Sequence, residues 1–477
     1  MLFAFQSQYF SSDSAYFHVK HIEHIRDTGK PMLYDSLSYG GKAVLYPPLF
    51  HYILAFLSLF IPLVIVLKII PALMLGLLAV IVYLLGIELT QDYRAAFFSA
   101  TLTAFIPLLV SRTLNQVSVY TFILPLFFFM IYCFLKIKEK KSYLWYFIGL
   151  SLLFPFLHPN AFLFVLVLLF YVALLVSEGF TLSKIHKEAL VFSALLIILL
   201  EFFFYRSALL EHGFGVLQGG IPAQFLPSVF QSVNVLEIFY HVGVATIVLG
   251  SFGVYSLLFR KREKHALLLV SVVLSTLLLL LFKLLDFFGG LLFLGVTLGV
   301  LSSIAFAHLF KYVSITKLAK YQSYLLLIFF VVVLVFSFLP SYYLANQVVT
   351  QSISDDEVIS LLWIRDHTPK ESVVLADVDE GNYINAIAQR KNIADISFLL
   401  APDALVRLED IKIMYLTFSE ARALSLFRKY HVNYIYVSKE TKQKYSFTKL
   451  IYTTNAQCFK KVQAYGTTEI YQILCST

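Results

Sequence analysis

The stretch SSDSAYFHVKHIEHIRDTGKPMLYDSLSYGGKAVLYPPLFH, residues 11–51, concentrates acids, histidines, bases and tyrosines in a chain that is otherwise largely apolar. Each unpaired charge placed in hydrocarbon costs at least about 2.5 kcal/mol. We therefore expect this opening segment to face water at one surface of a membrane. A polar segment at the mouth of a membrane bundle is a place where chemistry on a lipid-carried substrate can occur.

The composition is typical of a polytopic membrane protein rather than a soluble one. Of the 477 residues, 59% are hydrophobic and only 14% are charged, and the mean hydropathy is +0.79. A soluble core does not need this much apolar surface. The net charge of +8 lies largely in short loops between apolar runs, so it does not indicate a nucleic-acid partner. The three cysteines are too few and too scattered for a zinc site.

Apolar runs of roughly membrane length predict about ten transmembrane helices. They fall near 66–87, 95–111, 119–137, 143–157, 160–177, 188–205, 239–259, 265–285, 290–309 and 322–340. A shorter apolar helix at Pro47–Phe60 is expected to lie in the interface.

The loop charges assign the sides of this bundle. One set of loops holds many more lysines and arginines than the alternate set, which has only Arg112 and Arg206. The basic set is expected in the cytoplasm, which places the opening segment, the loop 206–238 and the carboxyl-terminal region outside. If residues 49–67 cross the membrane as a separate helix, the opening segment moves to the cytoplasm instead.

From about residue 350 the pattern predicts a small extracytoplasmic α/β domain. Ser354 and Glu357 form a capping-box signature, 419–430 is an amphipathic helix, 432–437 is a strand, and the tail is a hairpin turning near Gly466. Such a turn places Cys458 opposite Cys475. We expect a disulfide there, the alternative being two unpaired small hydrophobic residues. The predicted regions are 1–65 (opening loop), 66–345 (helical bundle with the long outer loop 206–238) and 346–477 (α/β domain).

Several motifs, taken with this layout, are similar to those of a known family. The opening segment contains Asp13-x-x-Tyr16-x-His18, Gly29-x-Pro31, Tyr34-Asp35, Gly40-Gly41-Lys42 and Tyr46-Pro47-Pro48-Leu49. PLLVSRTLNQVSVY (107–120) and LLWIRDHTPKESVVLADVDEGNYINAIAQRKNIAD (361–395) follow later in the chain. In these features the chain resembles the GT-C glycosyltransferases, and among them the catalytic subunit of oligosaccharyltransferase and its archaeal relatives.

The resemblance implies a GT-C-like helical bundle with an outer α/β domain, and an enzyme of protein glycosylation. Such an enzyme transfers a sugar or oligosaccharide, with inversion, from a polyprenyl- or dolichyl-phosphate-linked donor to a protein or glycan acceptor at the extracytoplasmic face. An archaeal source is implied by the resemblance alone. The loop 206–238 takes the place of the family's mobile loop, and its glycines suit a flexible lid.

The chain also departs from the family pattern. The family's first transmembrane helix is missing before residue 11, so we expect a truncated start or a fragment. The second-loop acids fall on Val119-Tyr120-Thr121, and the acceptor-reading motif near Asp377-Val378-Asp379 lacks its tryptophans. A divalent cation, Mg²⁺ or Mn²⁺, is implied by the family, but the missing acids weaken that expectation. They also weaken the case for asparagine-linked transfer.

Asp13 is the leading catalytic residue, since a carboxylate can take the acceptor's proton or bind a hard cation. Its alternative role is capping the helix that begins there. Lys42 and Arg112 are the candidates for the donor phosphate, although Arg112 can also snorkel to the interface. Asp379 is the acceptor-side candidate.

His18, Asp35 and His158 are supporting candidates. His18, His21 and His24 share one helix face and either bind a metal or form the polar side of an interfacial helix. Asp35 is a second acid or the start of an Asx turn, and His158 lines the site or belongs to a turn.

Two other functions compete with sugar transfer: a catalytically inactive GT-C-like scaffold and a transporter of lipid-linked sugars. The absent second-loop acids favour the scaffold. The transporter is disfavoured because few ionisable residues lie at mid-membrane positions.

Overall fold

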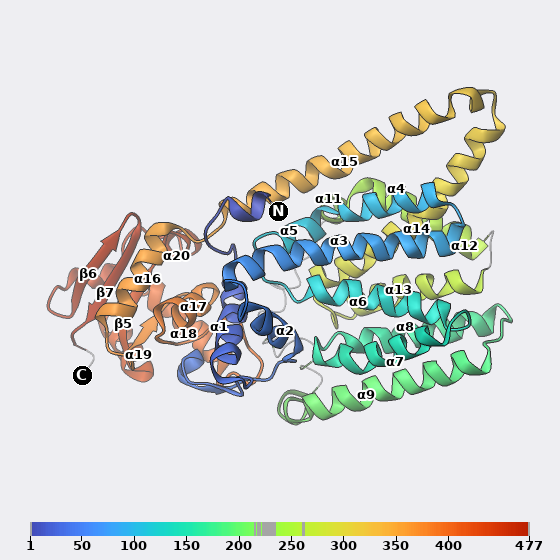
Figure 1. Cartoon of the computed structure of the whole chain (residues 1–477). Helices are drawn as coiled ribbons and strands as arrows, with labels where there is room; N and C mark the ends of the chain where they lie inside the picture. Colours follow the sequence, from blue (N-terminus) through green and yellow to red (C-terminus); the bar gives the residue numbers. More distant parts are fainter. Residues whose placement is uncertain (1, 214–215, 217–220, 222–234, 260–262, 476–477) are drawn as a thin grey trace. The chain divides into compact units, whose positions relative to one another are not determined.

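The computed structural model describes residues 2–213, 216, 221, 235–259 and 263–475 (Figure 1). The chain divides into two compact units. The first contains Met1–Ser7, Tyr46–Leu210 and Phe225–Thr350, and the second contains Gln8–Leu45, Glu211–Gln224 and Gln351–Thr477. Most of the opening segment, up to Leu45, therefore folds with the carboxyl-terminal region. Most of the predicted lid, at 214–215, 217–220 and 222–234, lies outside the described residues.

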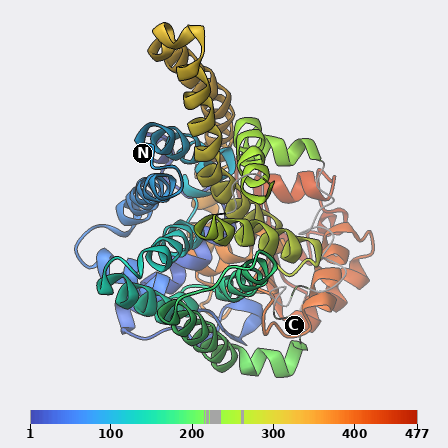
Figure 2. The same cartoon turned by 90° about the vertical axis from the view of Figure 1, so that its right-hand side faces the viewer.

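The first unit is a helical bundle, seen along two directions in Figures 1 and 2. Its helices are α2 (Leu49–Ser58), α3 (Leu63–Thr90), α4 (Tyr93–Ala104), α5 (Pro107–Thr113), α6 (Tyr120–Lys136), α7 (Lys141–Leu153), α8 (Ala161–Ser177), α9 (Lys184–His212), α11 (Val235–Val242), α12 (Val244–Phe259), α13 (Lys264–Leu281), α14 (Phe287–Ile315) and α15 (Gln322–Thr350).

Five helices in the described residues are long and apolar enough to cross a membrane, and seven spans result if two bent pairs each count as one. The chain is thus an integral membrane protein, but the expected count of about ten spans is not confirmed. Pro107 begins α5 after a 55° bend from α4, and Gly243, with φ of +91°, separates α11 from α12 at a 92° bend. Three predicted spans correspond to the shorter helices α6, α7 and α8.

Small residues let two of these helices approach closely. A Cβ added to Gly250 or Gly253 on α12 would collide with the backbone of Leu298 or Leu301 on α14. Such small-residue contacts are how membrane helices gain packing when lipid offers no hydrophobic driving force. Gly250 and Gly253 therefore allow the backbones of α12 and α14 to pack directly against each other.

The second unit contains a mixed five-stranded sheet of order β4-β3-β5-β7-β6. Its elements are α1 (Asp13–Thr28), β1 (Tyr34–Asp35), β2 (Lys42–Ala43), α16 (Asp355–His367), β3 (Val373–Leu375), α17 (Gly381–Tyr383), β4 (Lys391–Asn392), α18 (Ala404–Leu416), α19 (Glu420–Tyr430), β5 (Val432–Val437), α20 (Lys439–Lys444), β6 (Phe459–Tyr465) and β7 (Thr468–Ile473). Strand β3 runs parallel to β4 and β5, whereas β7 is antiparallel to β5 and β6.

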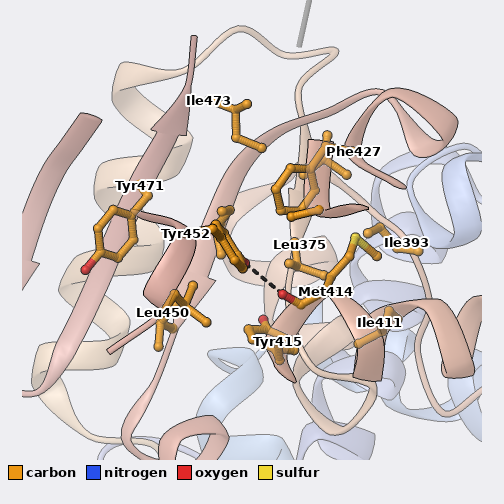
Figure 3. Close-up of a cluster of buried hydrophobic side chains, with 14 of the residues drawn as sticks. Leu375, Ile393, Ile411, Met414, Tyr415, Phe427, Leu450, Tyr452, Tyr471 and Ile473 are labelled. Carbon is orange, nitrogen blue, oxygen red and sulfur yellow. Dashed lines mark hydrogen bonds between the residues drawn. The ribbon is translucent and has the colours of Figure 1, made fainter. Parts of the chain in front are cut away.

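The core of this unit lies between the sheet and helices α18 and α19 (Figure 3). Phe427, Met414 and Tyr452 are buried there, and the Tyr452 hydroxyl donates a 2.8 Å hydrogen bond to the Met414 carbonyl. Tyr39 of the opening segment belongs to the same core and is 2% exposed. Opening segment and carboxyl-terminal domain therefore share one hydrophobic core.

Features set by local chemistry follow the sequence prediction. Ser354 and Glu357 form the expected capping box at α16, Ser419 caps α19, and β6 and β7 are joined through Gly466. Cys458 and Cys475 are bonded, with Cα atoms 4.8 Å apart, so the predicted disulfide is confirmed.

Removing this disulfide should destabilise the second unit by about 3 kcal/mol, because a cross-link over a loop of this size restricts the unfolded chain. The two tryptophans are Trp145 in the first unit and Trp363 in the second. In a Trp145→Phe background, guanidinium unfolding followed by Trp363 fluorescence should shift for Cys458→Ser/Cys475→Ser. The Cys133→Ser variant, a free cysteine on α6, is the control. An unchanged midpoint for the double variant would contradict the prediction.

Candidate functional site

Asp13 is the first residue of α1, and Ser12 occupies the cap position. Its carboxylate is buried, with the Asn382 side chain donating to Oδ2 at 2.6 Å and the Tyr383 backbone N–H donating to Oδ1 at 3.0 Å. Burial raises the pKa of the Asp13 carboxyl well above its usual range, and the hydrogen bond from Asn382 offsets part of that rise.

A divalent cation at Asp13 would need several oxygen ligands. Both Asp13 oxygens already accept hydrogen bonds, and the described residues contain no group of three or more His, Cys, Asp or Glu arranged to hold an ion. The surroundings of Asp13 do not fit a bound cation, so no step is derived through one. The metal dependence implied by the resemblance stays a prediction.

Lys42 is buried in the second unit, where it pairs with a carboxylate of its own chain. Its ammonium lies 3.8 Å from Asp395, donates to the Ser397 carbonyl and sits 4.7 Å from the centre of the Tyr39 ring. Burial lowers the pKa of Lys42, while Asp395 acts to raise it. With these partners, Lys42 contributes to the tie between the opening segment and the domain, and its phosphate role stays a prediction.

Asp35 starts the Asx turn that was one of its two predicted roles, since its Oδ1 accepts from the backbone N–H groups of Leu37 (3.0 Å) and Ser38 (3.3 Å). It also pairs with Lys20 at 2.5 Å. Burial alone would raise the pKa of Asp35, but Lys20 and the two backbone donors bring it below its usual value.

The three histidines of α1 are not equivalent. His21 is fully buried, with Nδ1 2.7 Å from the Phe17 carbonyl, whereas His18 and His24 are half-buried.

Asp379 lies on an exposed turn of the second unit and pairs with Lys444 at 2.7 Å. Lys444 also binds Asp377 at 2.5 Å. The next residue, Glu380, is 3% exposed and accepts hydrogen bonds from the Ser438 and Thr441 hydroxyls. Burial raises the pKa of Glu380 to about 8. The predicted acceptor-side segment is therefore acidic, and Lys444 of α20 bridges its two aspartates, Asp377 and Asp379.

Arg112 lies at the end of α5 in the first unit, half-buried, with its guanidinium 4.6 Å from the centre of the Phe288 ring. Among the described residues the guanidinium makes no hydrogen bond or ion pair. Arginine matches phosphate oxygens through parallel N–H donors. The N–H donors of Arg112 are thus unused among the described residues, although the negative charge of Asp286 lies close enough to act on the guanidinium.

A polar network lies beside Arg112. The Tyr120 hydroxyl donates to Asp286, Asn160 donates to the Tyr120 oxygen at 3.0 Å, and the second Asp286 oxygen accepts from the Gly289 N–H at 2.7 Å. The ring of His158 is 5.4 Å from that of Tyr120. Its Nδ1 accepts from the Asn160 N–H at 3.1 Å, so His158 belongs to the turn before α8. Burial lowers the pKa of His158 to about 4, so it is neutral near pH 7.

The structure therefore gathers the predicted residues into two sets. Arg112 and His158 belong to the network of the first unit, whereas Asp13, His18, Asp35, Lys42 and Asp379 belong to the second unit. Sequence reasoning missed Asn160, Asn382 and Asp395 as partners. An asparagine or aspartate flanked by apolar residues, as in LHPN (157–160) and NIAD (392–395), is a signal of buried polar contacts.

Comparison with known proteins identifies the fold. No protein-family profile and no curated protein sequence matches the chain. Among solved structures, the apo oligosaccharyltransferase of Archaeoglobus fulgidus superposes with a TM-score of 0.69 at 15% identity, covering 98% of this chain and 71% of that one. The chain has the GT-C fold.

Two further structures extend this likeness. The ArnT protein of Cupriavidus metallidurans, bound to undecaprenyl phosphate, matches with a TM-score of 0.54 at 11% identity over 98% of this chain and 94% of that chain. The mycobacterial arabinofuranosyltransferase AftD matches with a TM-score of 0.57 at 16% identity over 100% of this chain and 39% of that chain. The chain spans only 66% of the peptide-tethered Archaeoglobus structure. At these identities the GT-C likeness establishes the fold alone.

Glu380 gives a pH-dependent prediction for the stability of the second unit. Its pKa rises from 4.5 to about 8 on folding, so the folded state holds the proton more tightly. The stability contributed by protonated Glu380 is full below about pH 4.5 and is lost as the pH rises towards 8.

Glu380→Gln should therefore stabilise the second unit relative to the parent more at pH 8 than at pH 5, by a few kcal/mol. Trp363 fluorescence during unfolding of the Trp145→Phe protein measures this difference. The exposed Glu409→Gln substitution on α18 is the matched control. Equal effects of Glu380→Gln at both pH values would contradict the assignment.

Proposed function

We propose that this protein is a membrane glycosyltransferase that transfers a sugar from a polyprenyl-phosphate-linked donor, with inversion, to a protein or glycan acceptor at the extracytoplasmic face. The observation that carries the proposal is the unpaired guanidinium of Arg112, held beside a polar network at the ends of apolar helices in a GT-C fold. The carboxyl-terminal domain is assigned to the outer face because the basic loops are assigned to the cytoplasm.

The solved relatives support this class of donor. One Archaeoglobus structure is a complex with a dolichol-phosphate and an inhibitory peptide, and the Cupriavidus protein is bound to undecaprenyl phosphate. Each ligand joins an anionic phosphate to a long apolar chain. Apolar helices together with an arginine whose N–H donors make no hydrogen bond among the described residues have the chemistry to bind both parts.

The proposed reaction is a substitution at the anomeric carbon of the donor sugar. The acceptor oxygen or nitrogen forms a bond to that carbon, and the bond from the carbon to the phosphate oxygen breaks. The phosphate leaves with the electron pair, and Arg112 stabilises its developing charge. The acceptor's proton passes to a carboxylate, and we propose Asp13 for this role because the family resemblance implies it.

For the acceptor we propose only a broad class, a protein or a glycan, whereas for the donor we propose a polyprenyl-phosphate-linked sugar. Asp379 and Lys444 present both charges on the exposed segment that aligns with the family's acceptor motif. This segment lacks the tryptophans of the asparagine-linked enzymes. The proposal is therefore sugar transfer in general, and asparagine-linked transfer is not part of it.

Arg112→Gln should lower sugar transfer by about 10²-fold, because it removes the charge that stabilises the leaving phosphate. The assay follows labelled sugar from a lipid-linked donor pool into an acceptor fraction, using the full chain in membranes. Arg206→Gln changes the other base of the sparse loop set, exposed on α9, and should have little effect. Equal activities of the parent and Arg112→Gln would overturn the proposed function.

Asp13→Asn separates the chemical role of Asp13 from its structural one. The amide has the same shape, still accepts from the Tyr383 N–H, and donates to Asn382 once the Asn382 amide rotates by 180°. Its melting temperature should therefore stay near that of the parent, whereas transfer should fall by about 10²–10⁴-fold because the base is lost.

Asp13→Ala leaves the Tyr383 and Asn382 donors unsatisfied and should also destabilise the second unit by about 1–3 kcal/mol. Trp363 fluorescence in the Trp145→Phe protein provides the stability measurement for both variants. If Asp13→Asn transfers sugar at the parental rate, the carboxylate acts only in holding α1, and the catalytic assignment is wrong.

A further inference from the structure

A second group of polar residues lies at the opposite end of the bundle from Arg112. Helix α6 begins at Tyr120 and α13 ends shortly before Asp286, and both of these residues belong to the network beside Arg112. The two helices have 17 and 18 residues, so each rises about 25 Å, which is close to the thickness of the hydrocarbon core of a bilayer. Their other ends, at Lys136 and Lys264, therefore lie near the other surface of the membrane.

Hydrogen bonds join the ends of four helices at that surface. The Nε2–H of His186, in the first turn of α9, donates to the Phe134 carbonyl of α6 at 3.1 Å. The Tyr171 hydroxyl of α8 donates to the Lys264 carbonyl at 3.3 Å, and the Lys264 ammonium donates to the Thr181 carbonyl in the connection between α8 and α9. The ammonium of Lys264 is thus held in place, and an ammonium has three N–H donors to use.

A second lysine lies beside this anchored ammonium. Lys138, in the connection between α6 and α7, lies close enough to Lys264 for the two positive charges to repel each other, and both charges act on His186. Among the described residues, neither lysine forms an ion pair. Like charges held together in this way are stabilised when an anion binds between them.

The acids of the neighbouring connections do not pair with these two lysines. Glu88 and Glu139 are both bound to Lys136, at 2.6 and 2.5 Å. Glu178 and Glu263 also lie at this surface, and in the described part of the chain neither forms an ion pair with the two lysines. The pair is therefore open to an anion from outside the protein.

Aromatic side chains place the pair at the level of the lipid headgroups. Trp145 and Tyr146 are 63% and 54% exposed in the second turn of α7, which begins at Lys141 and packs against α6. Exposed tryptophan and tyrosine side chains are typical of the interface between membrane and water. Because α7 follows directly on the connection that carries Lys138, this lysine lies at the same interface.

We propose that Lys138 and Lys264 bind the phosphate of an anionic glycerophospholipid at the membrane surface opposite Arg112. Basic sites between the ends of membrane helices are typical of anionic headgroup binding. Val176, 73% exposed at the end of α8, offers an apolar contact to an acyl chain, which a free phosphate does not have. The bound lipid joins the α6–α7 connection to the start of α13. This inference does not depend on the proposed function.

The first test is native mass spectrometry of the full chain, released from micelles that contain phosphatidylglycerol and phosphatidylcholine in equal parts. Phosphatidylcholine has the same phosphate, but its quaternary ammonium cancels the charge. The parent should retain phosphatidylglycerol in preference, and Lys138→Gln/Lys264→Gln should lower this retention by about tenfold. The control, Lys311→Gln/Lys317→Gln, removes two exposed lysines near the end of α14, at the same surface. An equal loss in both double variants would mean that general surface charge attracts the lipid, and the site would be refuted.

A second variant avoids any effect of Lys264 on folding, since that side chain also holds the Thr181 carbonyl. Lys138 is exposed and makes no side-chain hydrogen bond among the described residues, so Lys138→Glu should leave the melting temperature unchanged. Its reversed charge should abolish the preference for phosphatidylglycerol. Retention at the parental level in Lys138→Glu would show that the lipid does not bind at this pair.

A third test separates the lipid from a free anion. In a Trp363→Phe background, Trp145 fluorescence reports the unfolding of the first unit. Adding phosphatidylglycerol to phosphatidylcholine nanodiscs should raise the melting temperature of this protein, whereas millimolar inorganic phosphate should not. An equal rise with inorganic phosphate would assign the pair to a soluble anion and contradict the lipid proposal.

Arg112→Gln distinguishes this site from the proposed donor site. Because Arg112 lies at the other end of α6 and α13, the variant should retain phosphatidylglycerol as the parent does, whether or not it loses sugar transfer. If Arg112→Gln loses the retained lipid while Lys138→Glu keeps it, the lipid binds at Arg112 and the inference is wrong.

Discussion

The second unit depends on the buried carboxylate of Asp395. It is 1% exposed and accepts hydrogen bonds from Ser38 (2.5 Å), Asn392 (3.1 Å) and the Ser397 N–H (2.9 Å), with Lys42 at 3.8 Å. Removing one partner from a buried charge is costly, since the charge is left uncompensated. The donors come from the opening segment and from the carboxyl-terminal domain, so Asp395 binds two parts of the chain that are more than 300 residues apart.

This constraint decides which polar residues of the opening segment are available for chemistry. Lys42 pairs with Asp395, and the Ser38 hydroxyl donates a hydrogen bond to it. Asp35 pairs with Lys20 and accepts hydrogen bonds within its own turn. Tyr39 is buried in the domain core. Asp13 is held differently, by two neutral donors rather than by a cation. Burial raises the pKa of its carboxyl, and the hydrogen bonds from Asn382 and Tyr383 offset only part of that rise.

Features that depend on residues close together in the sequence could be predicted from it. Contacts between residues far apart in the sequence could not. The capping box, the hairpin and the Cys458–Cys475 pair depend on spacings within about 20 residues, and all were found. The number of spans stays unconfirmed, because five helices of the described residues, or seven spans with the two bent pairs, are long and apolar enough to cross a membrane. Lys42 was read as a free cation, because its partner Asp395 is unrecognisable without the fold.

Arg112 shows a different case, in which a carboxylate lies near a cation but, among the described residues, forms no hydrogen bond or ion pair with it. Asp286 lies in the same network, yet its oxygens accept from Tyr120 and from the Gly289 N–H, where it caps α14. The Arg112 guanidinium lies against the face of Phe288. A cation–π contact holds a guanidinium in place without using its N–H donors. The N–H donors of Arg112 therefore stay available to an anionic group, which is the feature on which the proposed phosphate role depends.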